Sequence, residues 1–205
     1  MIKHLALIDE PLARNNVLIE QASLYIKLKS YAQAHALLEQ IQPEDDEDAY
    51  VRALLMNATL SREQGEFGQG LEYVERALKY YPDNIYIRYS QAMMFEHMGR
   101  LEQSIEVLEQ ILLDFPFETE SYNGLGYVLA DNNIRLDDAV LLIERALAMA
   151  PDSVHIQDSY GWVNFRLGNL ALAKSYLEMA WDKEPLAEVA AHLADVYYEL
   201  GDTDK

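Results

Sequence analysis

The stretch Glu72-Tyr-Val-Glu-Arg-Ala-Leu-Lys-Tyr-Tyr-Pro82 has three related copies in the chain, and together they decide the fold. The copies cover residues 106–116, 141–151 and 175–185, and their closing prolines lie 34, 35 and 34 residues apart. Two further positions recur with the same period. The residue twelve before each proline is small, and the residue eight before it is large and apolar. A fixed period of this length is typical of a solenoid, in which one unit stacks on the next.

The recurring small residue predicts a close approach between two helices. The positions in question are Ala34, Gly70, Ser104, Ala139 and Ala173. A large apolar residue four positions later lies on the same helix face, one turn further on. Proline cannot continue a helix, so each closing proline marks the exit into the next helix.

Turns between paired helices are predicted where a residue that tolerates a left-handed backbone is present. Gly65, Gly99, Gly168 and Gly201 fulfil this role in four repeats. The repeat 119–153 has Asp131-Asn132-Asn133 and one extra residue instead. Asn and Asp tolerate the same backbone state, so the turn is expected to survive there.

A looser pattern marks the first helix of each unit, as Tyr122-x2-Leu125-Gly126, Tyr160-Gly161 and Leu193-Ala194-x2-Tyr197. With the proline and the small residue, it resembles the tetratricopeptide-repeat (TPR) family, whose unit reads W-x2-L-G-x2-Y, then A-x3-F, then P. The resemblance implies an all-α solenoid, a right-handed superhelix of antiparallel helix pairs. Arg88 and Gln157 depart from the pattern, since the family often has Trp in those places.

A single solenoid is therefore predicted, with five full repeats and a half-repeat at each end. The predicted ranges are 1–14, 15–48, 51–84, 85–118, 119–153, 154–186 and 187–205. Residues 4–11 match the exit of a second helix whose first helix is absent, with Ala6 and Pro11 in the matching places. A solenoid with half-repeats at both ends is expected to continue in a longer native chain.

The net charge is strongly negative, with 35 acidic against 16 basic residues and a formal charge of −19. This balance argues against binding to nucleic acid or to anionic lipid, both of which need a basic surface. It favours either simple solubility or a preference for basic partners. The acidic run 44–48 is expected to be a solvated loop, with a docking site for a basic partner as the alternative. Absence of cysteine excludes disulfides and Cys-ligated zinc.

The TPR resemblance also implies a binding groove lined by the first helix of each pair. Residues beside the repeat signature are expected to point into it and to hold a partner protein or extended peptide. The predicted groove residues are Tyr86, Tyr89, Met93, Asn123, Tyr127, Asp158, Trp162, Phe165, Arg166 and Tyr198. Tyr and Trp are enriched at binding hot spots, and Asn123, Asp158 and Arg166 would orient a peptide. Packing of some rings between repeats is the alternative.

Catalysis, a cofactor and a metal site are not predicted. No Gly-rich phosphate loop is present, because Gly124-Leu125-Gly126 lies inside a helix as a packing device. The histidines are scattered over different repeats, and no two of them have a helical ligand spacing. No isolated pair of carboxylates stands out as an acid–base couple.

Residues 119–200 carry a narrower resemblance, in Leu125–Asp131, Asp158–Val163 and Ala187–Leu193. They are similar to the C-terminal repeats of proteobacterial TPR lipoproteins, such as the adaptor of a periplasmic carboxyl-terminal processing protease. The resemblance implies a periplasmic adaptor held at the outer membrane by a lipid anchor outside this chain, with the protease or a cell-wall hydrolase as partner. The alternatives are a cytoplasmic protein and a structural assembly factor of a pilus, secretion or envelope complex. Such a factor would bind through its convex face or its ends.

Overall fold

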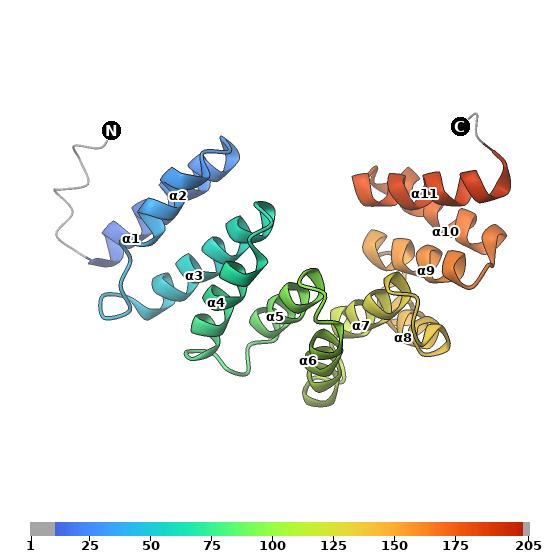
Figure 1. Ribbon diagram of the computed structural model, residues 1–205, viewed down its shortest axis with the longest axis horizontal. Helices are drawn as coiled ribbons and strands as arrows, with labels where there is room; N and C mark the ends of the chain where they lie inside the picture. The colour runs from blue at the N-terminus through green and yellow to red at the C-terminus, as the bar shows by residue number, and fades with distance from the viewer. Residues whose placement is uncertain (1–10, 203–205) are drawn as a thin grey trace. The chain divides into compact units, whose positions relative to one another are not determined.

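The computed structural model describes residues 11–202, and within them the chain is helical without any strand. The helices are α1 (Pro11–Lys27), α2 (Tyr31–Leu38), α3 (Glu47–Glu63), α4 (Phe67–Leu78), α5 (Ile85–His97), α6 (Leu101–Asp114), α7 (Thr119–Asp131), α8 (Leu136–Met149), α9 (Val154–Arg166), α10 (Leu170–Lys183) and α11 (Ala187–Leu200) (Figure 1). The all-α solenoid prediction is confirmed. No helix between residues 11 and 202 is long and apolar enough to cross a membrane.

Each predicted range from residue 85 onward contains complete helices. The ranges 85–118, 119–153 and 154–186 each contain one helix pair, and α11 fills the range after them. The helices α1 and α3 begin at Pro11 and Glu47, four residues before the boundaries predicted for their repeats. The prediction for residues 4–11 falls outside the described residues except for Pro11, which opens α1, a position that suits proline.

The early start of α3 corrects the prediction of a loop over residues 44–48. Asp46 is the N-cap of α3, and its Oδ1 accepts a hydrogen bond of 3.0 Å from the backbone N–H of Ala49. Glu47 and Asp48 then form the first helical turn. Negative charges are stabilising there, since they face the positive end of the helix dipole. The last three residues of the acidic run therefore start a helix.

The chain divides into two compact units, Met1–Val107 (unit 1) and Leu108–Lys205 (unit 2), and the division falls within α6. In unit 1, one core joins α1, α2 and α3 around Leu18, Leu38 and Leu60, and a second joins α3, α4 and α5 around Val74 and Ile87. In unit 2, a core joins α9, α10 and α11. Its buried residues are Val154, Ala173, Leu177, Ala180, Val189, Leu193 and Val196.

Close approach between paired helices is confirmed at the small positions. The side chains of Ala34, Ala139, Ala173 and Ser104 are fully buried. In α7, a Cβ added to Gly126 would lie 2.5 Å from Cγ1 of Ile143 and 3.1 Å from the carbonyl oxygen of Ala139. A contact below 3.0 Å leaves no room for a methyl group, so the first and second helices pack nearly backbone to backbone.

The predicted turns are also confirmed. The backbone φ angles at Gly65, Gly99, Gly168 and Gly201 are 76°, 72°, 81° and 76°. In the turn between α7 and α8, which has no glycine, Asn133 adopts φ 57° and Arg135 adopts φ 45°, and Lys29 adopts φ 56° in the turn between α1 and α2. Two left-handed residues therefore accommodate the extra residue of the turn between α7 and α8.

Candidate functional site

The richest cluster of polar and aromatic side chains lies on the first helices of unit 2. Helix α9 packs between α7 and α11 and contacts both of them. The side chains that join these helices form what we call the α7–α9–α11 network. Its members are Tyr127 and Asp131 of α7, Asp158 and Trp162 of α9, and Glu188 and His192 of α11.

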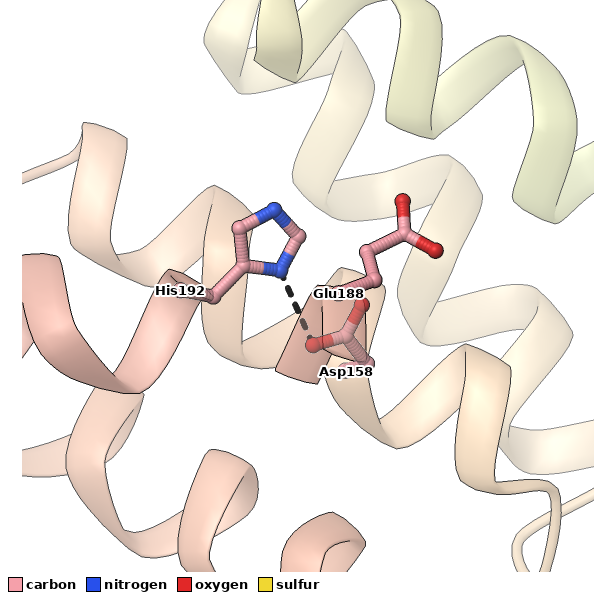
Figure 2. A group of neighbouring side chains, drawn as sticks. All are labelled: Asp158, Glu188 and His192. Atoms are coloured by element: carbon pink, nitrogen blue, oxygen red, sulfur yellow. Dashed lines mark hydrogen bonds and ion pairs between the residues drawn. The ribbon is translucent and has the colours of Figure 1, made fainter. Parts of the chain in front are cut away.

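A buried histidine–carboxylate pair links α9 to α11. Nδ1 of His192 and Oδ1 of Asp158 are hydrogen-bonded at 2.9 Å, and the two residues are 7 % and 4 % exposed (Figure 2). With its proton on Nδ1, the imidazole donates to the carboxylate. Glu188, one helical turn before His192, extends an exposed carboxylate toward the same place. One ligand atom from each of these residues lies within 4.8 Å of the other two.

Trp162 forms the aromatic centre of the network. Its ring stacks on the imidazole of His192, with centroids 4.2 Å apart and planes at 16°, and on Phe165 at 5.1 Å and 18°. Its Nε1 donates a hydrogen bond of 3.2 Å to Oδ1 of Asp131. The guanidinium of Arg166 lies 5.4 Å from the ring centroid and donates to the carbonyl oxygen of Asp131. These contacts fix the indole in one orientation.

Tyr127 connects α7 directly to α11. Its hydroxyl donates a hydrogen bond of 3.0 Å to Oε1 of Glu188, and its ring centroid lies 6.3 Å from that of His192. Burial raises the pKa of the Tyr127 phenol far above its ordinary value, and the charges of Glu188 and Asp131 raise it further. The phenol is therefore a permanent hydrogen-bond donor at neutral pH.

The predicted groove residues fall into three groups by exposure. Tyr86 and Tyr198 are each 74 % exposed. Tyr89, Met93, Asn123, Tyr127, Phe165 and Arg166 are half-buried. Asp158 and Trp162 are buried. This differs from the expectation that both face an open groove, because His192 of the next first helix covers the indole and binds the carboxylate.

The predicted groove residues belong to both units. Phe165, Arg166, Tyr127, Asp158 and Trp162 meet in unit 2 through the contacts above. Tyr86, Tyr89 and Met93 lie on α5 of unit 1, where the side chain of Asn84 caps the helix by accepting from the N–H of Tyr86.

Glu188 and His192 are site residues that the sequence prediction missed. No two histidines have a ligand spacing, but Glu188 and His192 form a carboxylate–imidazole pair with the i, i+4 spacing of neighbours on one helix face. The positions of these residues within the repeat also indicated that Asp158 and His192 are equivalent. Asn123, Asp158 and His192 each stand seven residues after the closing proline of the preceding repeat, so they occupy equivalent places on α7, α9 and α11.

Comparison with known proteins identifies relatives over most of the chain. A TPR repeat-containing protein of Pseudomonas aeruginosa is 31% identical over 177 residues, which are 86% of this chain and 30% of the relative. The uncharacterized protein ycf37 of Cyanophora paradoxa is 31% identical over 97 residues, which are 46% of this chain and 56% of that protein. The chain thus spans less than a third of the first relative and just over half of the second.

Solved structures share the fold. A thermophilic TPR protein of Thermus thermophilus superposes with a TM-score of 0.72 at 19% identity, covering 90% of this chain and 99% of its own. YrrB, a TPR protein with an unusual peptide-binding site, superposes with a TM-score of 0.55 at 18% identity, covering 87% and 90%. The tetratricopeptide-repeat profile itself matches residues 55–117, 97–154 and 132–188. Helix pairing, repeat period and profile agree, and the chain belongs to the tetratricopeptide-repeat family.

Proposed function

We propose that the chain is a protein-binding scaffold and that the first helices of unit 2 bind a segment of a partner protein. One observation carries the proposal: three successive first helices present rings and carboxylates that their mutual contacts already hold in place. Preorganised side chains lose little conformational entropy on binding, so their contacts convert efficiently into affinity. TPR proteins in general bind protein or peptide partners, which supports this assignment.

A basic segment is the partner that this surface fits best. Asp131, Glu188 and Asp195 are exposed carboxylates on α7 and α11, and the whole chain carries a net charge of −19. Complementary charge steers association and disfavours acidic competitors. The exposed ring of Tyr198 adds apolar contact area on α11 with a polar tip.

An adaptor role in a bacterial envelope is the finer form of the proposal. It rests on the resemblance of residues 119–200 to proteobacterial TPR lipoproteins. In this role the parent protein is periplasmic, it is anchored by a lipid outside this chain, and its partner is a processing protease or a cell-wall hydrolase. The P. aeruginosa relative is bacterial, as this role requires.

A different surface favours the alternative of a structural assembly factor. Helices α8, α9 and α10 line a cavity of about 380 Å³ away from the network. Its walls include the rings of Tyr160 and Tyr176, packed edge to face at 4.6 Å, and the exposed side chain of Met179. An assembly partner would dock here through an apolar side chain.

Two exposed-surface variants separate the proposals. The first carries Asp195→Asn and Tyr198→Ala on α11, and the second carries Met179→Glu on α10. Each protein serves as bait in a bacterial envelope extract, and a partner retained by the wild type is then titrated as a purified protein. At least a tenfold loss of affinity in the α11 variant alone supports binding by the first helices. A loss of affinity in the Met179→Glu variant alone would indicate that the partner binds at the cavity lined by α8, α9 and α10.

The adaptor role has its own readout in the same experiment. Recovery of a protease or cell-wall hydrolase supports it, whereas recovery of pilus or secretion components contradicts it. Circular dichroism of both variants confirms that the helices are intact. All three substitutions replace residues that are at least partly exposed, so a change in partner binding reports on the surface itself.

A further inference from the structure

Two carboxylates of the α7–α9–α11 network lie beside a single histidine. Asp158 is a buried carboxylate, and its polar partner in the described part of the chain is His192. Glu188 brings a second carboxylate within 4.8 Å of the ligand atoms of both residues. Between residues 11 and 202, no lysine or arginine forms an ion pair with either carboxylate. Buried charges are normally paired with an opposite charge or bound to a metal ion.

The positions of the three side chains suit one metal ion. Nδ1 of His192 and Oδ1 of Asp158 are 2.9 Å apart, near the separation of about 3.3 Å between two ligand atoms of a tetrahedral zinc site, and a bound ion replaces the proton that these two atoms now share. Glu188 and His192 are four residues apart on α11, so both project from one helix face toward Asp158 of α9 (Figure 2). An exposed Glu188 can rotate to complete the contact.

The surroundings hold the imidazole ready for coordination. The stacked ring of Trp162 supports one face of His192, and the tilted ring of Tyr127 lies beside it. The hydroxyl of Tyr127 orients Glu188 by donating to Oε1. Outer partners of this kind fix the direction of metal ligands and raise metal affinity.

We propose that Asp158, Glu188 and His192 form a binding site for a divalent transition-metal ion such as Zn²⁺. One imidazole and two carboxylates suit Zn²⁺, Co²⁺ and Ni²⁺. Water or a group from a partner takes the remaining coordination position. The bound ion neutralises the two carboxylates and joins α11 to α9. This inference rests on the positions of the three side chains, and it shares Glu188 with the surface proposed for a basic segment, so an ion titration tests it separately.

The two tryptophans of the chain allow a direct test. A Trp181→Phe variant leaves Trp162, which stacks on His192, as the sole tryptophan. The protein, purified without a histidine tag, is titrated with Ni²⁺ at pH 7.5 and its tryptophan fluorescence is followed. Calorimetry with Zn²⁺ gives the stoichiometry. The expected result is saturable quenching, with one ion bound per chain. Acidification should weaken binding, since the imidazole must be deprotonated to coordinate.

Ligand variants complete the test in the same background. His192→Gln and Glu188→Gln should each weaken binding at least tenfold. His155→Gln should leave it unchanged, because His155 is an exposed histidine that lies on α9 outside the cluster. Since Glu188 is exposed, its variant keeps the fold even if substitution of His192 disturbs it. Absence of saturable quenching up to 1 mM Ni²⁺ (about the weak limit of specific affinity), or equal binding by the wild type and Glu188→Gln, would overturn the proposal.

Discussion

The first helices of units 1 and 2 are built on the same repeat but are joined in different ways. In unit 1, α1 and α3 share an apolar core, and Arg52 of α3 adds an exposed hydrogen bond of 3.1 Å to Asn16 of α1. In unit 2, α7, α9 and α11 are joined by stacked rings and by hydrogen bonds to carboxylates. The repeat signature fixes the packing within a helix pair. The positions beside it are therefore where one repeat acquires a function that another lacks.

Aromatic residues give the sharpest contrast, and Trp162→Ala should have the largest effect on stability. Loss of a buried indole with its stacking partners is expected to cost about 3–5 kcal/mol of unfolding free energy. Tyr86→Ala on α5 should cost under about 0.5 kcal/mol, because that ring is 74 % exposed. Urea unfolding followed by circular dichroism measures both. Similar losses in the two variants would contradict the different burial of these rings.

Helix contact distances differ between the units as well. In Gly126→Ala, the new methyl group would meet Ile143 and a backbone carbonyl, which should destabilise unit 2 by about 1–3 kcal/mol. In Gly70→Ala, the methyl group meets the carbonyl oxygen of Ala58 at 3.3 Å, a longer backbone contact than at Gly126, and the flexible end of Met94 at 2.9 Å. That end can move, and alanine gains about 1 kcal/mol of helix propensity, so little net change is expected. Urea titration gives the unfolding free energy of both variants. A larger loss of stability in Gly70→Ala than in Gly126→Ala would contradict this prediction.

Alkaline pH should weaken unit 2 through Tyr127. Its pKa in the folded state is raised above the ordinary value of about 10 by burial, then by Glu188 and Asp131. The folded state therefore holds this proton longer than the unfolded state. The stabilisation is fully present below pH ~10 and is lost as the pH rises above it. Unfolding free energy measured from pH 8 to 11 should decline less steeply in Tyr127→Phe than in the wild type. The same slope in Tyr127→Phe and in the wild type would contradict the raised pKa of the Tyr127 phenol.

Acid pH should weaken unit 1 through His97, and this is the smallest effect expected. The ring stacks on Phe67 at 4.8 Å, and its pKa is lowered, first by burial and then by the charge of Arg62. The folded state therefore resists protonation. The stabilisation is present above the ordinary value of about 6.5 and is lost as the pH falls below it. His97→Gln should flatten the stability profile between pH 7 and 5, whereas an equally steep decline would contradict the assignment.

The fold could be predicted from the sequence because the repeat signature is local. Proline, glycine and small residues act through backbone geometry within one helix pair, so their spacing alone located the turns at Gly65 and Gly168 and the close approach at Gly126. The turn at Asn133 was predicted too, since Asn tolerates the same backbone conformation, whereas the left-handed Lys29 between α1 and α2 was not. The start of α3 was not predicted. A run of acidic residues favours a solvated loop on composition alone, but here Asp46 caps a helix and the two residues after it form the first turn.

The network was harder to predict because each of its contacts joins different repeats. Trp162 was predicted to be a groove ring. Its environment depends on His192, which lies thirty residues further on in the sequence, on the next first helix. The exposure of a first-helix side chain is set by whatever occupies the equivalent place on the next first helix. Alignment of the repeats by their prolines places Asp158 beside His192, whereas inspection of one repeat at a time does not.

The turn between α7 and α8 absorbs its additional residue at two left-handed positions, Asn133 and Arg135, without altering the register of the helices after it. Asn123 and Asp158 thus remain equivalent although they lie 35 rather than 34 residues apart. Among the repeats of this chain, this turn is a place where the length changes by one residue while the helix pairing is preserved. For the experimenter it offers an insertion point for an epitope or a fluorescent label that leaves the neighbouring first helices in place.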